Sequence, residues 1–190
     1  MNKNKLAIFD MDGTLFDTKN VNYQAYSKAL KLCGFEECID YEYYCDFCNG
    51  NNYKVFLPQI IENLSEEKMK EIHDKKKELY ADSLVYARKN IHLFNIIELI
   101  KKEYVIALVT TASLKNVTDI LEKFMVTEKF DLIVTQEDVR KTKPDPECFH
   151  LAMLKAGIDK ENTIIFEDSE TGLEAAKASG AQYVQVYGYN

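Results

Sequence analysis

The sequence has no apolar run long enough to cross a membrane, and it has fewer basic than acidic residues. Only Leu6 to Phe9 separate the N-terminal Met-Asn-Lys-Asn-Lys from Asp10, which is too short for the core of a secretory signal peptide. The 31 acidic residues outnumber 24 basic ones, and the formal net charge of −7 repels nucleic acid backbones and anionic membranes. We therefore expect a cytoplasmic protein with neither nucleic acid nor membrane as partner.

Cysteine and histidine are also scarce. Five cysteines, an odd number, suit a reducing compartment better than a disulfide framework. Cys45 and Cys48 have the spacing of half a zinc site or of a redox pair, but no histidine and no second close pair accompanies them. We predict that they pack as small buried hydrophobic residues. No chemistry is assigned to the isolated histidines, which are His73, His92 and His150.

The chain lacks internal repeats and low-complexity tracts, and it consists of two kinds of pattern. Residues 18–88 have helical periodicity, with a helix closed by Gly34 and another beginning at Ser65. Elsewhere apolar strands alternate with helices. Strands are expected up to Phe9 and at 104–109, 132–134, 163–166 and 183–186; helices are expected at 93–102, 114–124, 146–156 and 172–179. Such alternation predicts an α/β fold with a parallel sheet and right-handed crossovers, into which the helical block is inserted.

The first strand is followed by an acidic pair. Residues 8–18 read Ile-Phe-Asp-Met-Asp-Gly-Thr-Leu-Phe-Asp-Thr. In an extended segment Asp10 and Asp12 point to the same side, and Gly13 permits a sharp turn. Two such carboxylates repel each other unless they share a proton or bind a divalent cation. An Asp at this position can also be a simple turn residue, and for Asp10 alone that interpretation would be the stronger one.

Polar residues also follow the other strands, where ligands of parallel sheets gather. Thr110-Thr-Ala-Ser113 offers hydroxyls and backbone N–H groups ahead of a helix, which is typical of an anion site. Lys143 lies in Lys-Thr-Lys-Pro-Asp-Pro, just before another helix. Glu167 and Asp168 end an apolar strand, and burying them is costly unless a cation compensates.

The four groups together resemble the motifs of the haloacid dehalogenase superfamily, mostly phosphatases and phosphotransferases that form an aspartyl-phosphate. The resemblance covers almost the whole chain. The chain is similar in particular to the subfamily with a helical cap, which includes phosphoglycolate phosphatases and β-phosphoglucomutases. It implies a Rossmann-like catalytic core at residues 1–16 and 89–190, with the cap at 17–88. It also implies an enzyme, a Mg²⁺-dependent phosphatase of a small phosphorylated metabolite, expected as a monomer with a dimer as the alternative.

The resemblance also implies roles for matching residues. Asp10 would be the nucleophile and Asp12 the general acid and base. Phosphoryl oxygens would be held by Lys143 and Thr110, together with the groups at Thr111 and Ala112. Mg²⁺ would be held by Asp10, the main-chain carbonyl of Asp12, Asp168 and Glu167.

Substrate identity stays open at this point. Lys54 lies where related enzymes place a specificity loop, although a plain polar loop is an equal interpretation. Related phosphosugar mutases carry a histidine where this chain has Asn22, whereas Lys76 resembles a cap lysine that those enzymes use. All three residues are candidate substrate contacts. The alternatives to a phosphatase are therefore a phosphosugar mutase using the same intermediate and, more distantly, a non-catalytic phosphoreceiver or binding module.

Overall fold

The computed structural model describes residues 3–36 and 39–187. The chain divides into two compact units. Unit 1 consists of Met1–Asp17 and Arg88–Asn190, and unit 2 consists of Thr18–Ala87.

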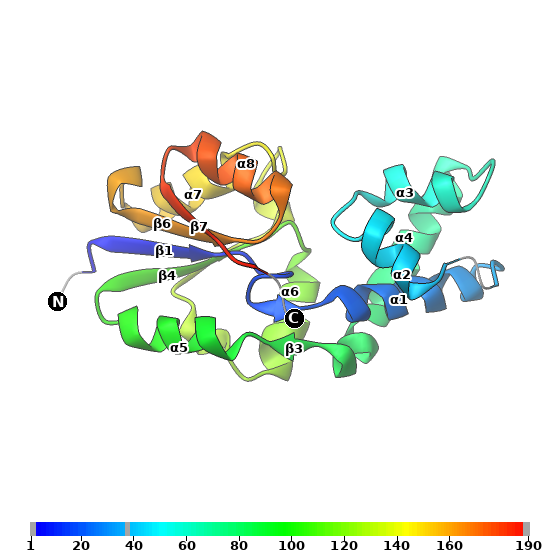
Figure 1. The fold of residues 1–190 in the computed structure, drawn as a ribbon, viewed down its shortest axis with the longest axis horizontal. Coiled ribbons are helices and arrows are strands. Elements are labelled where there is room, and N and C mark those ends of the chain that lie inside the picture. The colour runs from blue at the N-terminus through cyan, green and yellow to red at the C-terminus, as the bar shows by residue number, and fades with distance from the viewer. Residues whose placement is uncertain (1–2, 37–38, 188–190) are drawn as a thin grey trace. The chain divides into compact units, whose positions relative to one another are not determined.

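Unit 1 is built on a five-stranded sheet in the order β5-β4-β1-β6-β7 (Figure 1). Every neighbouring pair is parallel, as the alternating sequence pattern predicted, so the α/β fold class is confirmed. β1 is the central strand, and its last residue, Phe9, pairs with Leu108 on one side and Phe166 on the other. The strands are β1 (Lys5–Phe9), β4 (Tyr104–Val109), β5 (Leu132–Val134), β6 (Thr163–Glu167) and β7 (Gln182–Gln185).

Helices cover both faces of this sheet, with α7 and α8 on one face and α5 on the other (Figure 1). The side chains of Asn90, Ser113 and Ser169 cap the N-termini of α5, α6 and α8. Helices α7 and α8 end at glycines with left-handed backbone. The helices are α5 (Ile91–Ile100), α6 (Leu114–Lys123), α7 (Glu147–Ala156) and α8 (Glu170–Ser179), with single 3₁₀ turns at Thr127–Lys129, Gln136–Asp138 and Lys160–Asn162.

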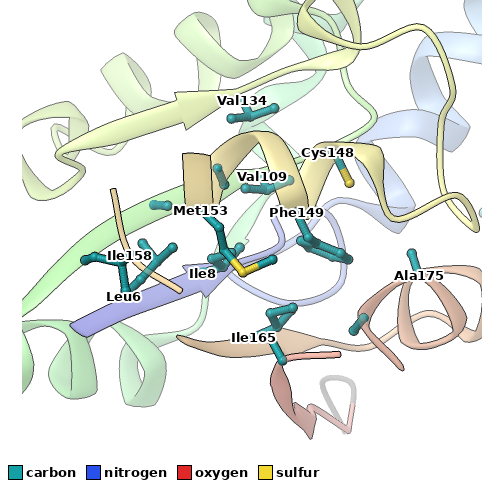
Figure 2. Packing of buried hydrophobic residues seen from close by; sticks show 14 residues of the cluster. Leu6, Ile8, Val109, Val134, Cys148, Phe149, Met153, Ile158, Ile165 and Ala175 are labelled. Atoms are coloured by element: carbon teal, nitrogen blue, oxygen red, sulfur yellow. The ribbon is translucent and has the colours of Figure 1, made fainter. Parts of the chain in front are cut away.

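The main core of unit 1 lies between the sheet and α7 with α8 (Figure 2). Ile8 and Ile165 from neighbouring strands and Phe149 from α7 are fully buried there. The β-branched side chains that predicted strands in the sequence therefore also pack α7 against the sheet. This packing fixes the strand ends from which the polar residues emerge.

A two-stranded antiparallel sheet marks the points where the chain leaves and re-enters unit 1. It pairs β2 (Phe16–Asp17) with β3 (Arg88–Lys89). The Arg88 guanidinium also contacts the Asp17 carboxylate at 2.5 Å. The long connection between β2 and β3 therefore starts and ends at two residues that pair with each other in this sheet, Asp17 and Arg88.

Unit 2 is helical, and it has a core of its own made of aliphatic and aromatic side chains. Tyr26 on the first helix, Phe56 on the third and Ile72 on the fourth are buried together. The longest helix has 18 residues, and none of the helices described combines the length and the hydropathy needed to cross a membrane. The elements are α1 (Lys19–Leu32), α2 (Tyr41–Tyr43), a π-helix (Tyr44–Cys48), α3 (Tyr53–Ile60), α4 (Glu66–Ser83) and a 3₁₀ turn (Leu84–Tyr86).

Several local expectations are corrected. Leu32, the last residue of α1, and Leu114, the first residue of α6, are 67% and 55% exposed although both are apolar. Pro146 is the N-cap of α7 rather than its first residue. Cys45 and Cys48 lie in the π-helix, where Cys48 is buried and Cys45 is half-buried.

Candidate active site

Three acidic side chains meet at the carboxyl ends of the two central strands. Asp10 follows β1, Glu167 ends β6 and Asp168 comes next, and the Asp10 backbone N–H donates to the Phe166 carbonyl at 3.0 Å. One carboxylate oxygen from each acid lies within 4.8 Å of the others. We call these three residues the acid cluster. Parallel pairing of β1 with β6 brings together residues that are far apart in the sequence.

Two glycines make room for the acid cluster. Gly13 has φ of +88°, and a Cβ built there would lie 2.0 Å from Asp168 Oδ2. Gly172, in the first turn of α8, faces Glu167, and a Cβ there would lie 1.7 Å from Glu167 Oε1. The turn at Gly13 was predicted from the sequence, but its contact with Asp168 and the whole role of Gly172 were not.

Lys143 binds two of the three acids. Its Nζ lies 2.6 Å from Asp10 Oδ1 and 2.8 Å from Glu167 Oε1, and its side chain is 4% exposed. Its Nζ also lies over the Phe149 ring, 5.1 Å from the ring centre. The lysine that sequence analysis placed just before α7 is therefore an integral part of the site.

Burial and repulsion by neighbouring carboxylates raise the pKa of Asp10 and of Asp168. Desolvation raises the pKa of Asp10 well above its usual range; the Lys143 charge lowers it, and Glu167 and Asp168 raise it. Burial likewise raises the pKa of Asp168 to about 6, against the hydrogen bond from Thr14. Burial acts to lower the pKa of Lys143, but the two carboxylates outweigh it and the pKa is raised. Three carboxylates around one ammonium leave an excess of negative charge, which suits a divalent cation with oxygen ligands.

Neighbouring hydroxyl groups orient two of the acids. Thr14 Oγ1 donates to Asp168 Oδ1 at 2.8 Å. The backbone N–H and the hydroxyl of Ser169 donate to Glu167 Oε2 at 2.7 and 3.1 Å. Sequence analysis gave neither residue a role, although Thr14 lies inside the quoted first motif and Ser169 directly follows Asp168.

Asp12 lies beside the acid cluster but is not one of its three members. It is half-buried and follows Asp10 on the same turn. Its charge also raises the pKa of Asp168, but by less than burial and the Glu167 charge do. The two aspartates of the first motif therefore occupy different environments.

The segment after β4 forms the expected turn before α6. Thr110 is buried, and its Oγ1 accepts a hydrogen bond from the Ala112 backbone N–H at 3.0 Å. That N–H was expected to be available to an anion, but in this structure Thr110 binds it. Thr111 is exposed, and Ser113 caps α6 by accepting from the Asn116 N–H at 3.3 Å.

The other predicted substrate contacts all belong to unit 2. Asn22 is half-buried on α1, and Lys54 is exposed in the first turn of α3. Lys76 is buried on α4, with Nζ 5.4 Å from the ring centre of Tyr26 and 5.0 Å from that of Tyr80. The predicted residues are thus divided between the units, and the acid cluster with Lys143 and Thr110 belongs to unit 1.

The chain is similar to known hydrolases in both sequence and fold. Residues 7–186 match the family described as haloacid dehalogenase-like hydrolase. The phosphorylated carbohydrates phosphatase of Thermotoga maritima is 29% identical over 95% of this chain and 83% of that protein. The fructose-1-phosphate phosphatase YqaB of Escherichia coli is 26% identical over 94% of each. The crystal structure of CbbY from Rhodobacter sphaeroides in complex with phosphate has a TM-score of 0.84 at 25% identity, over 97% of this chain and 87% of that one.

Proposed function

The chain belongs to the haloacid dehalogenase-like hydrolase family, and from that premise we propose that it is a Mg²⁺-dependent phosphatase of a small phosphorylated metabolite. The observation that carries the proposal is the acid cluster, in which Lys143 Nζ contacts Asp10 and Glu167 at 2.6 and 2.8 Å. The names of two similar proteins, phosphatases of phosphorylated carbohydrates and of fructose-1-phosphate, support the substrate class.

The donor set fits a hard divalent cation. Its carboxylate oxygens lie within 4.8 Å of one another, and hard cations prefer oxygen ligands. Asp10, Glu167, Asp168 and the main-chain carbonyl of Asp12 would hold Mg²⁺. When bound, this ion supplies the positive charge that offsets repulsion between a carboxylate and a phosphate dianion.

Asp10 is the proposed nucleophile. One of its oxygens bonds to phosphorus as the bond from phosphorus to the leaving oxygen breaks, which gives an aspartyl-phosphate. Asp10 is 7% exposed and held by Lys143 at 2.6 Å, so its carboxylate is fixed in direction before the substrate arrives.

Asp12 is proposed to move the protons. It would protonate the departing alkoxide and then take a proton from the water that cleaves the aspartyl-phosphate. The half-buried position of Asp12, outside the acid cluster, supports a task different from that of Asp10.

Lys143 and Thr110 are proposed to hold the transferring group. The charge of a loose phosphoryl transition state is spread over its equatorial oxygens, and a buried ammonium stabilises that charge more strongly than it would in water. Lys143 is suited to this because its neighbouring carboxylates keep it protonated.

Unit 2 is proposed to act as the cap that selects the substrate. It carries Asn22, Lys54 and Lys76, and its helices pack around their own core. A cap of this kind closes over the substrate and excludes bulk water during phosphoryl transfer.

The test is phosphate release from a panel of sugar phosphates, nucleotides, phosphoglycolate and pyrophosphate, with and without Mg²⁺ and chelator. Net release that requires Mg²⁺ but no bisphosphate activator supports the phosphatase. Activity that needs a bisphosphate and gives no net release identifies the phosphosugar mutase. Stable phosphorylation without turnover identifies the phosphoreceiver. Full activity in excess chelator would contradict the proposed mechanism.

A further inference from the structure

Asn90 connects the start of α5 to the turn after β1. Its Oδ1 accepts from the Leu93 N–H at 3.2 Å and so caps α5. Its Nδ2 donates to the main-chain carbonyl of Thr14 at 3.1 Å, and its backbone N–H donates to the Leu15 carbonyl at 2.9 Å. A single asparagine thus binds two consecutive residues of the turn.

That turn confines one acid of the site. Thr14 is fully buried, and its Oγ1 donates to Asp168 Oδ1 at 2.8 Å. On the other side, the position of a Cβ at Gly13 would be only 2.0 Å from Asp168 Oδ2, so the backbone itself approaches this oxygen closely. The direction of the Asp168 carboxylate therefore depends on where the turn at residues 13–14 is held.

We propose that Asn90 is a positioning residue for Asp168, acting through Thr14. The inference rests on the proposed function, in which Asp168 helps to hold Mg²⁺. The side-chain amide of Asn90 fixes the position of the Thr14 peptide, and the Thr14 hydroxyl fixes Asp168 Oδ1. The other lone pairs of the Asp168 carboxylate then remain available within the acid cluster, where Mg²⁺ would bind. Without this support the carboxylate would have to be ordered when the ion binds, which weakens binding.

The variant Asn90→Asp separates this role from helix capping. Aspartate caps a helix as well as asparagine does, so the bond from Leu93 N–H is kept. Its second oxygen cannot donate, and it would repel the Thr14 carbonyl. The matched control is Asn95→Asp, the same change at an exposed position on the same helix.

The measurement is Mg²⁺ binding to the intact protein by isothermal titration calorimetry, with thermal unfolding in chelator as a check on folding. We expect the Mg²⁺ dissociation constant of Asn90→Asp to rise about fivefold to tenfold, which corresponds to one lost hydrogen bond. The control should bind Mg²⁺ as the wild type does. Equal affinity in Asn90→Asp and Asn95→Asp would overturn the proposal.

Thr14→Val and Thr14→Ser provide a second route should Asn90→Asp fail to fold. Valine matches the shape of threonine but lacks the donor, whereas serine keeps it, so Mg²⁺ affinity should fall in the first variant and be restored in the second. If both routes act on Asp168, the double variant Thr14→Val with Asn90→Asp should lose less affinity than the sum of the two losses. Unchanged affinity in Thr14→Val, or additive losses, would contradict the proposed route.

The same titration separates failure of this inference from failure of the proposed function. A wild-type protein that binds no Mg²⁺ overturns the proposed function, and the positioning role with it. A wild-type protein that binds Mg²⁺, beside an Asn90→Asp variant that binds it equally well, overturns only the role of Asn90.

Discussion

At the residue scale, the site requires that two positions next to its carboxylates carry no side chain. Gly172 leaves the space that Glu167 fills, and Gly13 leaves the space that Asp168 fills. A side chain at either glycine would displace an acid or the backbone that carries it. These requirements are invisible in the sequence, because each glycine faces a residue whose position only the fold determines.

Gly172→Ala tests this requirement, because the expected change in stability is opposite to the one that glycine-to-alanine exchange usually causes in a helix. In an ordinary helix the exchange of glycine for alanine stabilises by about 0.5–1 kcal/mol. Here the added methyl group would overlap Glu167 Oε1, so we expect lower stability and lower phosphatase activity. Chemical denaturation and phosphate release measure the two effects. A more stable and fully active Gly172→Ala protein would show that the crowding does not exist.

Asp10→Asn tests the proposed nucleophile. The amide keeps the shape of the side chain but cannot form the covalent intermediate, so turnover should fall by about a thousandfold or more. The control is Asp159→Asn, which makes the same change at an exposed residue of unit 1. Phosphate release under saturating Mg²⁺ compares them, and comparable activity in the two variants would rule out Asp10 as the nucleophile.

At the element scale, the sequence predicted best where local pattern and tertiary packing agree. β4 and β5 have the predicted bounds, because their apolar runs are long enough to mark buried strands. The strand ends also indicated Asp10, Glu167 and Asp168, and the loop before α7 indicated Lys143, which contacts two of these acids. Asn90 and Thr14 escaped notice because their bonds join segments distant in the chain, and no local spacing encodes such contacts.

Helix α4 carries a histidine that should make stability sensitive to acid. His73 Nδ1 lies 2.9 Å from the Tyr26 hydroxyl, and the Tyr53 ring stacks on the imidazole at 4.0 Å. Burial, followed by the charges of Lys77 and Lys76, lowers the pKa of His73 from 6.5 to about 4. Between these values the unfolded chain binds a proton that the folded chain does not. The free energy of unfolding should therefore fall as pH drops from about 6.5 to 4.

Replacement of the imidazole isolates this contribution. His73→Gln should show a flatter dependence of the free energy of unfolding on pH across that window, since glutamine does not titrate. His92→Gln, at an exposed histidine on α5, should retain the dependence of the wild type. Urea denaturation at several pH values provides the comparison, and parallel curves for His73→Gln and wild type would refute the assignment.

At the scale of the whole molecule, chemistry and substrate choice are proposed to belong to different units. Lys143→Ala, in unit 1, should reduce turnover of every substrate, because the transferring phosphoryl group is common to all. Lys54→Ala, in unit 2, should raise the Michaelis constant of the preferred substrate and leave small generic phosphates nearly unchanged. Both variants are measured on the same panel. A uniform loss in Lys54→Ala or a selective loss in Lys143→Ala would contradict this division.

The central position of β1 has a consequence for biosynthesis. β1 leaves the ribosome long before its two neighbouring strands, since Leu6 pairs with Val105 and Thr163. Contacts of such long range slow folding, whereas the helices of unit 2 find their partners within residues 18–87 and can pack earlier. A nascent chain that stops short of β6 contains Asp10, the proposed nucleophile, but neither Glu167 nor Asp168. The proposed phosphoryl chemistry therefore has to wait until Asp168 has been translated.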